Sequence, residues 1–257
     1  MARRVVLTRP AQEAGGWQQR LGEAGHEVHL LPLIDIVPLP ADHGAADVLA
    51  RRDAVMLVSA SAVRAFFGQW AGREWPAGVR CWAPGPGTAR ALQEAGVPPA
   101  LIDQPAAGAP QFDSEALWAV VSAQVRPGHR LLLVRGLSEA ARAAGMASSG
   151  REWLARQCEA AGGQVLALPV YERRCPAWDP ATQARARALL AEDAIWLFSS
   201  GEAAGHLRQL LPDGAWRDVP ALATHPRIAQ ALTALGWQAV RTVRPEPEAV
   251  LGALAAD

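Results

Sequence analysis

Short apolar runs alternate along the chain with longer stretches in which apolar side chains recur at helical spacing. The run RVVL near residue 5 precedes a helical stretch over 12–24, and a second apolar run follows around Val28. Repetition of this order is typical of parallel sheets covered by helices on both faces. We therefore predict an α/β fold. The expected strands lie near residues 5, 28, 55, 80, 131, 165, 195, 221 and 239, and the expected helices lie over 12–24, from about 60 and from about 87.

The chain also contains an internal repeat. DAVMLVSASAV from Asp53 matches DAIWLFSSGEA from Asp193, and VRCWAPGPGTARALQEAGV from Val79 matches VPALATHPRIAQALTALGW from Val219, both at an offset of 140 residues without a gap. Such a repeat predicts two related units, and by itself it would divide the chain once, near residue 126. The second copy carries the insertion LSEAARAAGMASSG over 137–150, whose composition is typical of a mobile loop.

Composition narrows the classes of function. The 257 residues are half hydrophobic, which is enough for one large or two modest domains. Formal net charge is zero, so no long-range field draws the protein to nucleic acid. All 25 basic residues are arginines, and the lack of lysine excludes Schiff-base chemistry and the lysine of a phosphate-binding P-loop. The three cysteines, which have no metal-site spacing and are expected to be reduced and mostly buried, are Cys81, Cys158 and Cys175.

The first residues, MARRVVLTRP, contain an apolar run too short for a signal peptide or a membrane span. We therefore expect a cytoplasmic protein whose partners include neither a membrane nor a nucleic acid.

An ordered set of motifs extends over nearly the whole chain: VVLTRP, PLIDIVP, VSASAVRAFF, APGPGTARALQEAG, LLLVRG, PVYERR, WLFSSGEAAGHL and ATHPRIAQALTALG. In this order and spacing they resemble the uroporphyrinogen-III synthase family. The second repeat departs from the family pattern in two places. It has THPRIA where many members have a turn like GPTTA, and Gly201 stands where Ser61 stands in the first repeat.

The resemblance implies a two-domain α/β enzyme whose chain crosses between the domains twice, near 36–40 and near 172–176. Residues 1–37 and 173–257 would form one discontinuous domain, residues 38–172 would form the other, and a cleft would lie between them. It also implies the reaction, which closes the linear tetrapyrrole hydroxymethylbilane to uroporphyrinogen III with inversion of the terminal pyrrole ring. Neither a cofactor nor a metal is implied. A transient contact with the preceding enzyme of the pathway is an expected interaction.

The implied substrate carries an acetate and a propionate on every ring, so its site must hold many carboxylates. Helix N-termini at the carboxyl ends of parallel strands offer unpaired N–H groups for this purpose. The small or hydroxyl residues expected at these turns are Ser59, Ser61, Gly85, Thr88, Ser199, Ser200 and Thr224. Arg9 and Arg135, at the ends of equivalent strands, are expected to pair with propionates, and His225 is a further candidate ligand.

Each of these residues also has a purely structural interpretation. The hydroxyls can be plain helix N-caps, and Gly85 and Gly87 can serve backbone geometry alone. The arginines can form structural ion pairs, and His225 can be a surface residue. The remaining histidines show no metal spacing and are expected to be ordinary surface or cap residues: His26, His29, His43, His129 and His206. The ten tryptophans are assigned to packing.

Tyr171, in PVYERR, is the only tyrosine of the chain and matches a tyrosine in the family pattern. The resemblance implies that its phenol is the general acid for departure of the substrate hydroxyl. The alternative interpretation is an amphipathic core tyrosine.

A different class of function also fits a repeated α/β architecture. Non-catalytic solute-binding and sensor proteins close two similar lobes around a small anion. The lack of an export signal and of a DNA-binding segment argues against this alternative, and the lack of lysine argues against a nucleotide-dependent transferase.

Overall fold

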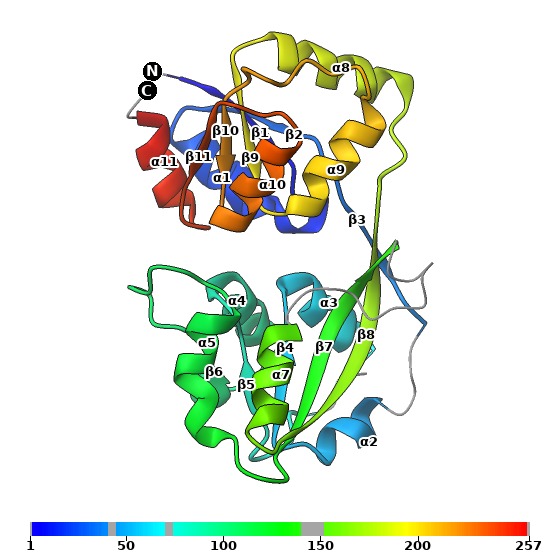
Figure 1. Cartoon of the computed structure of the whole chain (residues 1–257), viewed down its shortest axis with the longest axis vertical. Helices are drawn as coiled ribbons and strands as arrows, with labels where there is room; N and C mark the ends of the chain where they lie inside the picture. Colours follow the sequence, from blue (N-terminus) through cyan, green and yellow to red (C-terminus); the bar gives the residue numbers. More distant parts are fainter. Residues whose placement is uncertain (1, 41–44, 70–73, 140–151, 256–257) are drawn as a thin grey trace. The chain divides into compact units, whose positions relative to one another are not determined.

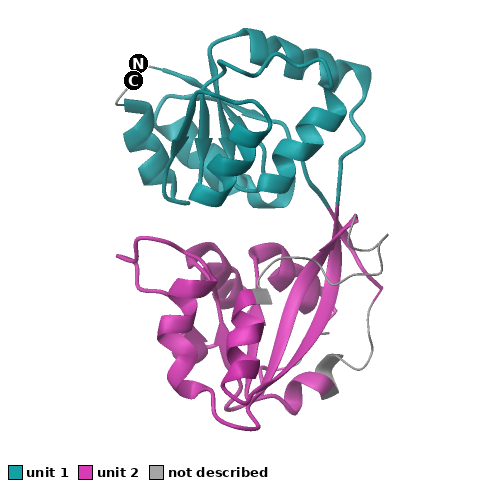
Figure 2. Cartoon of the chain, in the orientation of Figure 1, with its two compact units in different colours: residues 1–35, 174–257 teal, residues 36–173 magenta. Residues whose placement is uncertain are grey.

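The computed structural model describes residues 2–40, 45–69, 74–139 and 152–255. The chain divides into two compact units, shown in two colours in Figure 2. Unit 1 comprises Met1–Asp35 and Arg174–Asp257, and unit 2 comprises Ile36–Arg173. That each unit is a folding domain, with a cleft between the two, stays a prediction.

Unit 1 is built on a five-stranded parallel sheet in the order β11-β10-β9-β1-β2 (Figure 1). Its strands are β1 (Arg4–Leu7), β2 (Glu27–Leu30), β9 (Ala194–Phe198), β10 (Ala221–Ala223) and β11 (Val240–Thr242). Its helices are the 3-10 helix η1 (Ala11–Glu13), α1 (Gly15–Glu23), α8 (Pro180–Ala191), α9 (Gly201–Leu210), α10 (Pro226–Ala234) and α11 (Pro247–Ala255). The N-terminal strand β1 therefore lies inside a sheet whose other members come mostly from the last third of the chain.

Alternating side chains of this sheet build a core on each face. Leu7 and Leu197 pack with Leu21 of α1 on one face. On the other face, the ring of Trp196 lies 6.4 Å from that of Trp237. All five side chains are at most 2% exposed, which accounts for the apolar character of the strands in the sequence.

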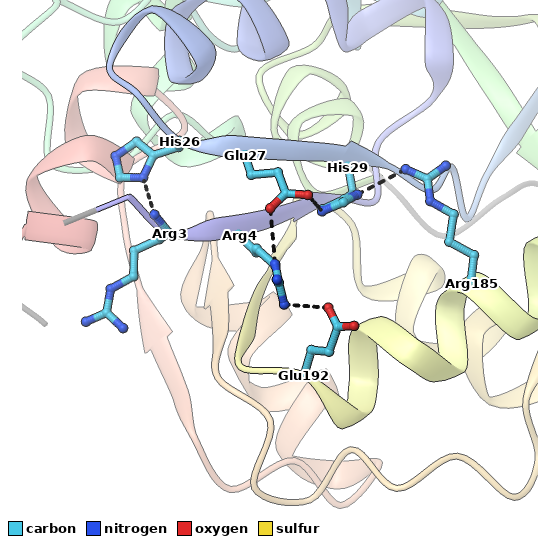
Figure 3. Close-up of polar contacts among 7 residues, drawn as sticks. All are labelled: Arg3, Arg4, His26, Glu27, His29, Arg185 and Glu192. Atoms are coloured by element: carbon cyan, nitrogen blue, oxygen red, sulfur yellow. Dashed lines mark hydrogen bonds and ion pairs between the residues drawn. The ribbon is translucent and has the colours of Figure 1, made fainter.

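Polar contacts tie α8 to the edge of the same sheet (Figure 3). Arg4 of β1 pairs with Glu27 at 3.1 Å and with Glu192 at 2.6 Å. His29 lies 3.0 Å from Glu27, and its Nδ1 lies 3.2 Å from the Arg185 guanidinium. Because arginine only donates, Nδ1 of His29 accepts this hydrogen bond. Exposed pairs of this kind contribute at most about 1 kcal/mol each, so they orient α8 more than they stabilise the fold.

Unit 2 is built on a six-stranded sheet in the order β3-β8-β7-β4-β5-β6. Its strands are β3 (Asp35–Pro38), β4 (Ala54–Leu57), β5 (Arg80–Trp82), β6 (Ile102–Asp103), β7 (Arg130–Ser138) and β8 (Gln164–Arg174), and the pairs from β8 to β6 are parallel. Its helices are α2 (Ala45–Ala50), α3 (Ala60–Gly68), α4 (Pro86–Glu94), η2 (Pro99–Leu101), α5 (Ser114–Val121), η3 (Ser122–Gln124) and α7 (Glu152–Ala160).

Two buried clusters sandwich this sheet. On one face Leu57 and Cys81 pack with Phe66 of α3 and with neighbouring residues of α4. On the other face Trp82 packs with the helices α5 and α7, and Cys158 of α7 belongs to that cluster. Two of the cysteines, Cys81 and Cys158, are buried, as expected, and burial raises the pKa of the Cys158 thiol to about 11.

The α/β class is confirmed, and a strand lies at each of the nine expected positions. Sequence reasoning missed two edge strands: β6, which has only two residues, and β3, which the proline-containing segment after Ile34 concealed. The helix expected over 12–24 begins later, at Gly15, because a 3-10 turn follows Pro10. The predicted loop over 137–150 is wrong at its start, since β7 continues to Ser138, and residues 140–150 lie outside the described residues.

Candidate functional site

The carboxyl edge of the unit 2 sheet carries two adjacent helix N-termini. Ser59 caps α3 two residues after β4, and its Oγ accepts the Ala62 N–H at 3.1 Å. Gly85 is the N-cap of α4, shortly after β5. Because β4 and β5 are neighbours in the sheet, both helices direct their unpaired N–H groups and positive dipole ends to one edge. Such an edge favours anions, as the sequence predicts.

Tyr171 reaches this edge from β8. Its Oη lies 3.1 Å from Ser59 Oγ, across 112 residues of sequence. The ring belongs to the apolar core, and the residue is 3% exposed. Since Ser59 Oγ already accepts the Ala62 N–H, its own proton is available for donation to Tyr171 Oη. In that arrangement the phenol proton is free for a further acceptor.

Gly136 explains how the tyrosine ring is accommodated. Gly136 pairs with Tyr171 across β7 and β8, where the register shifts after Arg135. A Cβ atom at this position would overlap the Cε2 and Cζ atoms of the Tyr171 ring. The ring therefore packs closely against bare backbone. Sequence analysis did not identify this contact, and its only signal was the glycine that follows Arg135 within an apolar strand.

Replacing Gly136 by alanine should therefore displace Tyr171 and break its bond to Ser59. We expect a stability loss of about 1–3 kcal/mol, typical of an overpacked core, and turnover reduced by about tenfold. Thermal unfolding and turnover measured on the same sample check this. Gly205→Ala is the matched control, because its added methyl meets nothing within 4 Å. Equal stability and activity for Gly136→Ala and the control would contradict the described packing.

The turn before α4 differs from the expected glycine turn. Gly85 has φ −175°, an extended conformation open to any residue, and Gly87 is an ordinary residue of α4. The alternative interpretation, that these glycines serve backbone geometry alone, therefore finds no support in the backbone angle at Gly85. The constraint at Gly85 is space, since an added Cβ would lie 3.1 Å from Cβ of Phe112. Thr88 and Ser61, both predicted ligands, are buried within the first turns of α4 and α3.

Gly85→Val should lower both stability and turnover, because the branched side chain would have to displace Phe112 from this turn. The expected stability loss is about 1–3 kcal/mol. Gly87→Ala, two residues on with nothing within 4 Å of the added methyl, should not lower the Tm. Wild-type turnover in Gly85→Val would remove this turn from the site.

The two candidate arginines differ in their positions. Arg135 lies inside β7, since the strand continues to Ser138, and not at a strand end as expected. Arg9 lies two residues beyond β1, is 9% exposed, and stacks its guanidinium 4.0 Å from the centre of the Trp17 ring. Burial lowers the pKa of Arg9 to about 10, against an opposing effect of Glu13. Within the part of the chain that the structure describes, its guanidinium makes no hydrogen bond, so a carboxylate would offset this desolvation.

The corresponding turns of unit 1 hold the other candidates. Ser200, and not Ser199, is the N-cap of α9, accepting the Glu202 N–H at 3.2 Å. The cap has thus moved by one residue relative to the first repeat. Thr224 is buried directly after β10, and the Nδ1 of His225 caps α10 by accepting the Arg227 N–H at 3.1 Å.

The candidates thus form two sets, one at the carboxyl edge of each sheet. Unit 2 holds Ser59, Ser61, Gly85, Thr88, Arg135 and Tyr171, and unit 1 holds Arg9, Ser199, Ser200, Thr224 and His225. The structure brings Ser59 and Tyr171 into direct contact. Across the four described ranges, no cluster of three or more His, Cys, Asp or Glu side chains is arranged to hold a metal ion.

The other described histidines are half-buried and not at the surface as expected. His26 accepts the Arg3 N–H, and Nδ1 of His206 lies 2.6 Å from the Leu33 carbonyl oxygen. His129 corrects the expectation, because its ring stacks on Trp82 and its Nε2 is buried. His43 lies outside the described residues.

Comparison with known proteins decides the family. The family model described as "Uroporphyrinogen-III synthase HemD" matches residues 16–252. The chain belongs to the uroporphyrinogen-III synthase family. A uroporphyrinogen-III synthase of Salmonella typhimurium is 28% identical over 261 residues, covering 97% of this chain and 99% of that protein. The family resemblance that the motifs predicted is therefore confirmed.

Solved uroporphyrinogen-III synthases show the same fold. The enzyme from Helicobacter pylori is 17% identical and has a TM-score of 0.58, covering 99% of this chain and 100% of that one. A mutant of the enzyme from the extremely thermophilic bacterium Thermus thermophilus is 21% identical and has a TM-score of 0.57, covering 99% and 98%. Among the described residues of this family member, no helix is both long and apolar enough to span a membrane.

Proposed function

We propose that this chain is a uroporphyrinogen-III synthase, closing hydroxymethylbilane to uroporphyrinogen III with inversion of the terminal pyrrole ring. The family match over 16–252 carries this conclusion. The contact between Ser59 and Tyr171 at an anion-favouring edge supports the chemistry.

The Tyr171 phenol is the proposed acid. The pyrrole nitrogen supplies the electron pair that breaks the bond between the methylene carbon and the hydroxyl, and Tyr171 Oη gives its proton so that water leaves. Attack on the methylene carbon through a spirocyclic intermediate then inverts the terminal ring, and the proton released on closure restores the phenol. Donation from Ser59 to Oη orients the phenol proton toward the substrate and stabilises the transient phenolate.

The enzyme's main role is to hold the substrate in one folded conformation, because the bilane closes without an enzyme to the uninverted isomer. The N–H groups at the starts of α3, α4, α9 and α10 hold substrate carboxylates, and Arg9 and Arg135 pair with propionates. Carboxylates fixed at several points hold the bilane in the folded conformation from which inversion proceeds. The reaction loses water without net oxidation or reduction, so it requires no cofactor.

The proposal extends to the setting of the reaction. We place the enzyme in the cytoplasm, with transient contact to the enzyme that supplies the bilane. Neither a membrane nor a nucleic acid is a proposed partner, and the zero formal net charge is consistent with this.

The alternative, a non-catalytic two-lobed protein that binds or senses a small anion, is not favoured, given the family match. An isomer-resolved assay separates the two. Hydroxymethylbilane is incubated either without the protein or with the protein at a concentration far below that of the bilane. Isomers I and III of the product are then quantified. An enzyme yields isomer III far beyond the amount of protein. Isomer III no higher than in the protein-free control would contradict the proposal.

A further inference from the structure

Arg9 is a buried cation without a polar partner. The residue is 9% exposed, and burial lowers the pKa of its guanidinium to about 10, an effect that the charge of Glu13 opposes. Among the residues that the structure describes, none forms a hydrogen bond or an ion pair with this guanidinium. Arginine is almost never buried in proteins unless it is paired, because removing a charge from water is costly. Another feature of unit 1 must therefore hold this side chain.

Trp17 is the side chain that holds it. The centre of the Trp17 ring lies 4.0 Å from the guanidinium carbon of Arg9, well inside the range of cation–π attraction. Trp17 is half-buried and packs against the apolar core of unit 1, which includes Leu7 and Leu21. The arginine is thus held by a ring that the core itself keeps in place.

The path of the chain between the two residues explains why they meet. After Arg9, Pro10 precedes a 3-10 turn, and α1 follows from Gly15. Trp17 therefore lies in the first turn of α1. Helical side chains lean toward the N-terminus of their helix, so the Trp17 ring extends back toward the end of β1, where Arg9 lies. The contact follows from local chain geometry.

An aromatic ring holds an arginine differently from a carboxylate. Arg4, at the start of the same strand, pairs with Glu27 and Glu192, and these carboxylates occupy its N–H donors. A ring attracts the face of the guanidinium and occupies none of its five N–H groups, which point outward in the plane of the cation. Arg9 is therefore held in place while its donors stay available to a ligand.

We infer that Trp17 is a positioning residue: it holds the Arg9 guanidinium, before the bilane arrives, in an orientation that lets two of its N–H groups bind one substrate carboxylate. The inference rests on the proposed function, in which Arg9 pairs with a propionate. A guanidinium that is already held in one orientation loses less conformational freedom on binding than a free side chain does. Trp17 acts through Arg9 and not on the reacting atoms.

Steady-state kinetics with hydroxymethylbilane test this in a double-mutant cycle. Trp17→Leu should raise KM about three- to tenfold and change kcat less than about twofold, because the carboxylate is held equally before and during the reaction. Arg9→Gln should raise KM at least about tenfold. Adding Trp17→Leu to Arg9→Gln should raise KM no further, because the ring then has no cation to hold. Trp17→Phe, which keeps an aromatic face, should stay near the wild type.

Trp216→Leu is the matched control in the same unit. Trp216 is 9% exposed, stacks on Trp237 and donates its indole N–H to the Leu235 carbonyl oxygen, so its loss should lower the Tm and leave KM unchanged. A merely structural Trp17 would give that same result. A wild-type KM in Trp17→Leu, or effects of Trp17→Leu and Arg9→Gln that multiply in the double variant, would overturn the inference.

NMR of the arginine side chains gives a test that does not depend on turnover. The ring current of Trp17 should shift the Arg9 Nε–H signal upfield in the wild type and in Trp17→Phe, but not in Trp17→Leu. Propionate, added at constant ionic strength with chloride as the reference, should move this signal saturably.

The wild-type NMR result decides the inference even where Trp17→Leu does not fold. An Arg9 signal at the position of exposed arginines, or one that does not respond to propionate, would overturn it. The absence of isomer III with the wild type, together with the expected NMR shifts, would instead reject the proposed function and leave a carboxylate site at Arg9.

Discussion

Tyr171→Phe should slow the formation of uroporphyrinogen III by about 10- to 1000-fold while leaving thermal stability almost unchanged. The substitution keeps the ring that packs against Gly136 and removes only the hydroxyl that meets Ser59. Residual activity is expected, because the pyrrole nitrogen can expel the hydroxyl once the substrate is held in shape. The measurement is the rate and the ratio of isomers III and I at matched concentrations of folded protein.

The same measurement separates the roles that Tyr171 can have. A slower rate with an unchanged isomer ratio is the result expected of a proton donor. A collapse to isomer I would mean that Tyr171 shapes the substrate instead. An unchanged rate would eliminate it as the acid and leave the packing role that its 3% exposure indicates. Ser59→Ala should reduce turnover less, about tenfold at most, because it removes one neutral hydrogen bond to a phenol that remains.

A chain that begins at residue 38 should fail to fold unit 1. It lacks β1, which pairs with β9 on one side and with β2 on the other, and it lacks α1, which covers one face of the sheet. The remaining strands would expose Ile195 and Leu197 and the unpaired edge of β9. Hydrogen exchange measured segment by segment should show protection lost in β9 and β10 and kept in β4 and β7.

A fragment of residues 127–257 gives the complementary test. If the repeat alone set the division, this fragment would be a complete half of the chain. In the structure, the fragment instead contains parts of both unit 1 and unit 2. We expect rapid proteolysis and no cooperative unfolding. A stable, independently folded fragment would contradict the discontinuous arrangement. Recovery of unit 1 when residues 1–37 are added to the shortened chain as a peptide would support it.

Strand positions were predictable because buried parallel strands leave an apolar signature, as in the run around Ile195. The class followed from the alternation of those runs with helices. Edge strands left little signal, since Ile102 and Asp103 form a single short pairing with β5. Which strands share a sheet was not readable from periodicity, because β1 joins β9 across most of the chain. The family resemblance, and not the pattern, implied that exchange.

For the site, residue type and turn position identified N-caps such as Ser59, Ser200 and His225. Contacts between distant segments were not predicted, because no local sequence pattern shows that Gly136 makes room for the Tyr171 ring. The alternative of a special backbone at Gly85 fails for a related reason. The tight space there comes from Phe112, which lies 27 positions further on in the sequence and reaches the turn only in the folded protein.

The most direct test of the account uses hydroxymethylbilane labelled with carbon-13 in its terminal pyrrole ring. The carbon-13 NMR spectrum of the product shows whether the acetate and propionate positions on that ring have exchanged. With wild-type protein at a concentration far below that of the bilane, we predict that nearly all of the labelled rings are inverted. In a protein-free sample, few of them should be inverted. Labelled rings that keep their original order, at the proportion seen without protein, would contradict the proposed function.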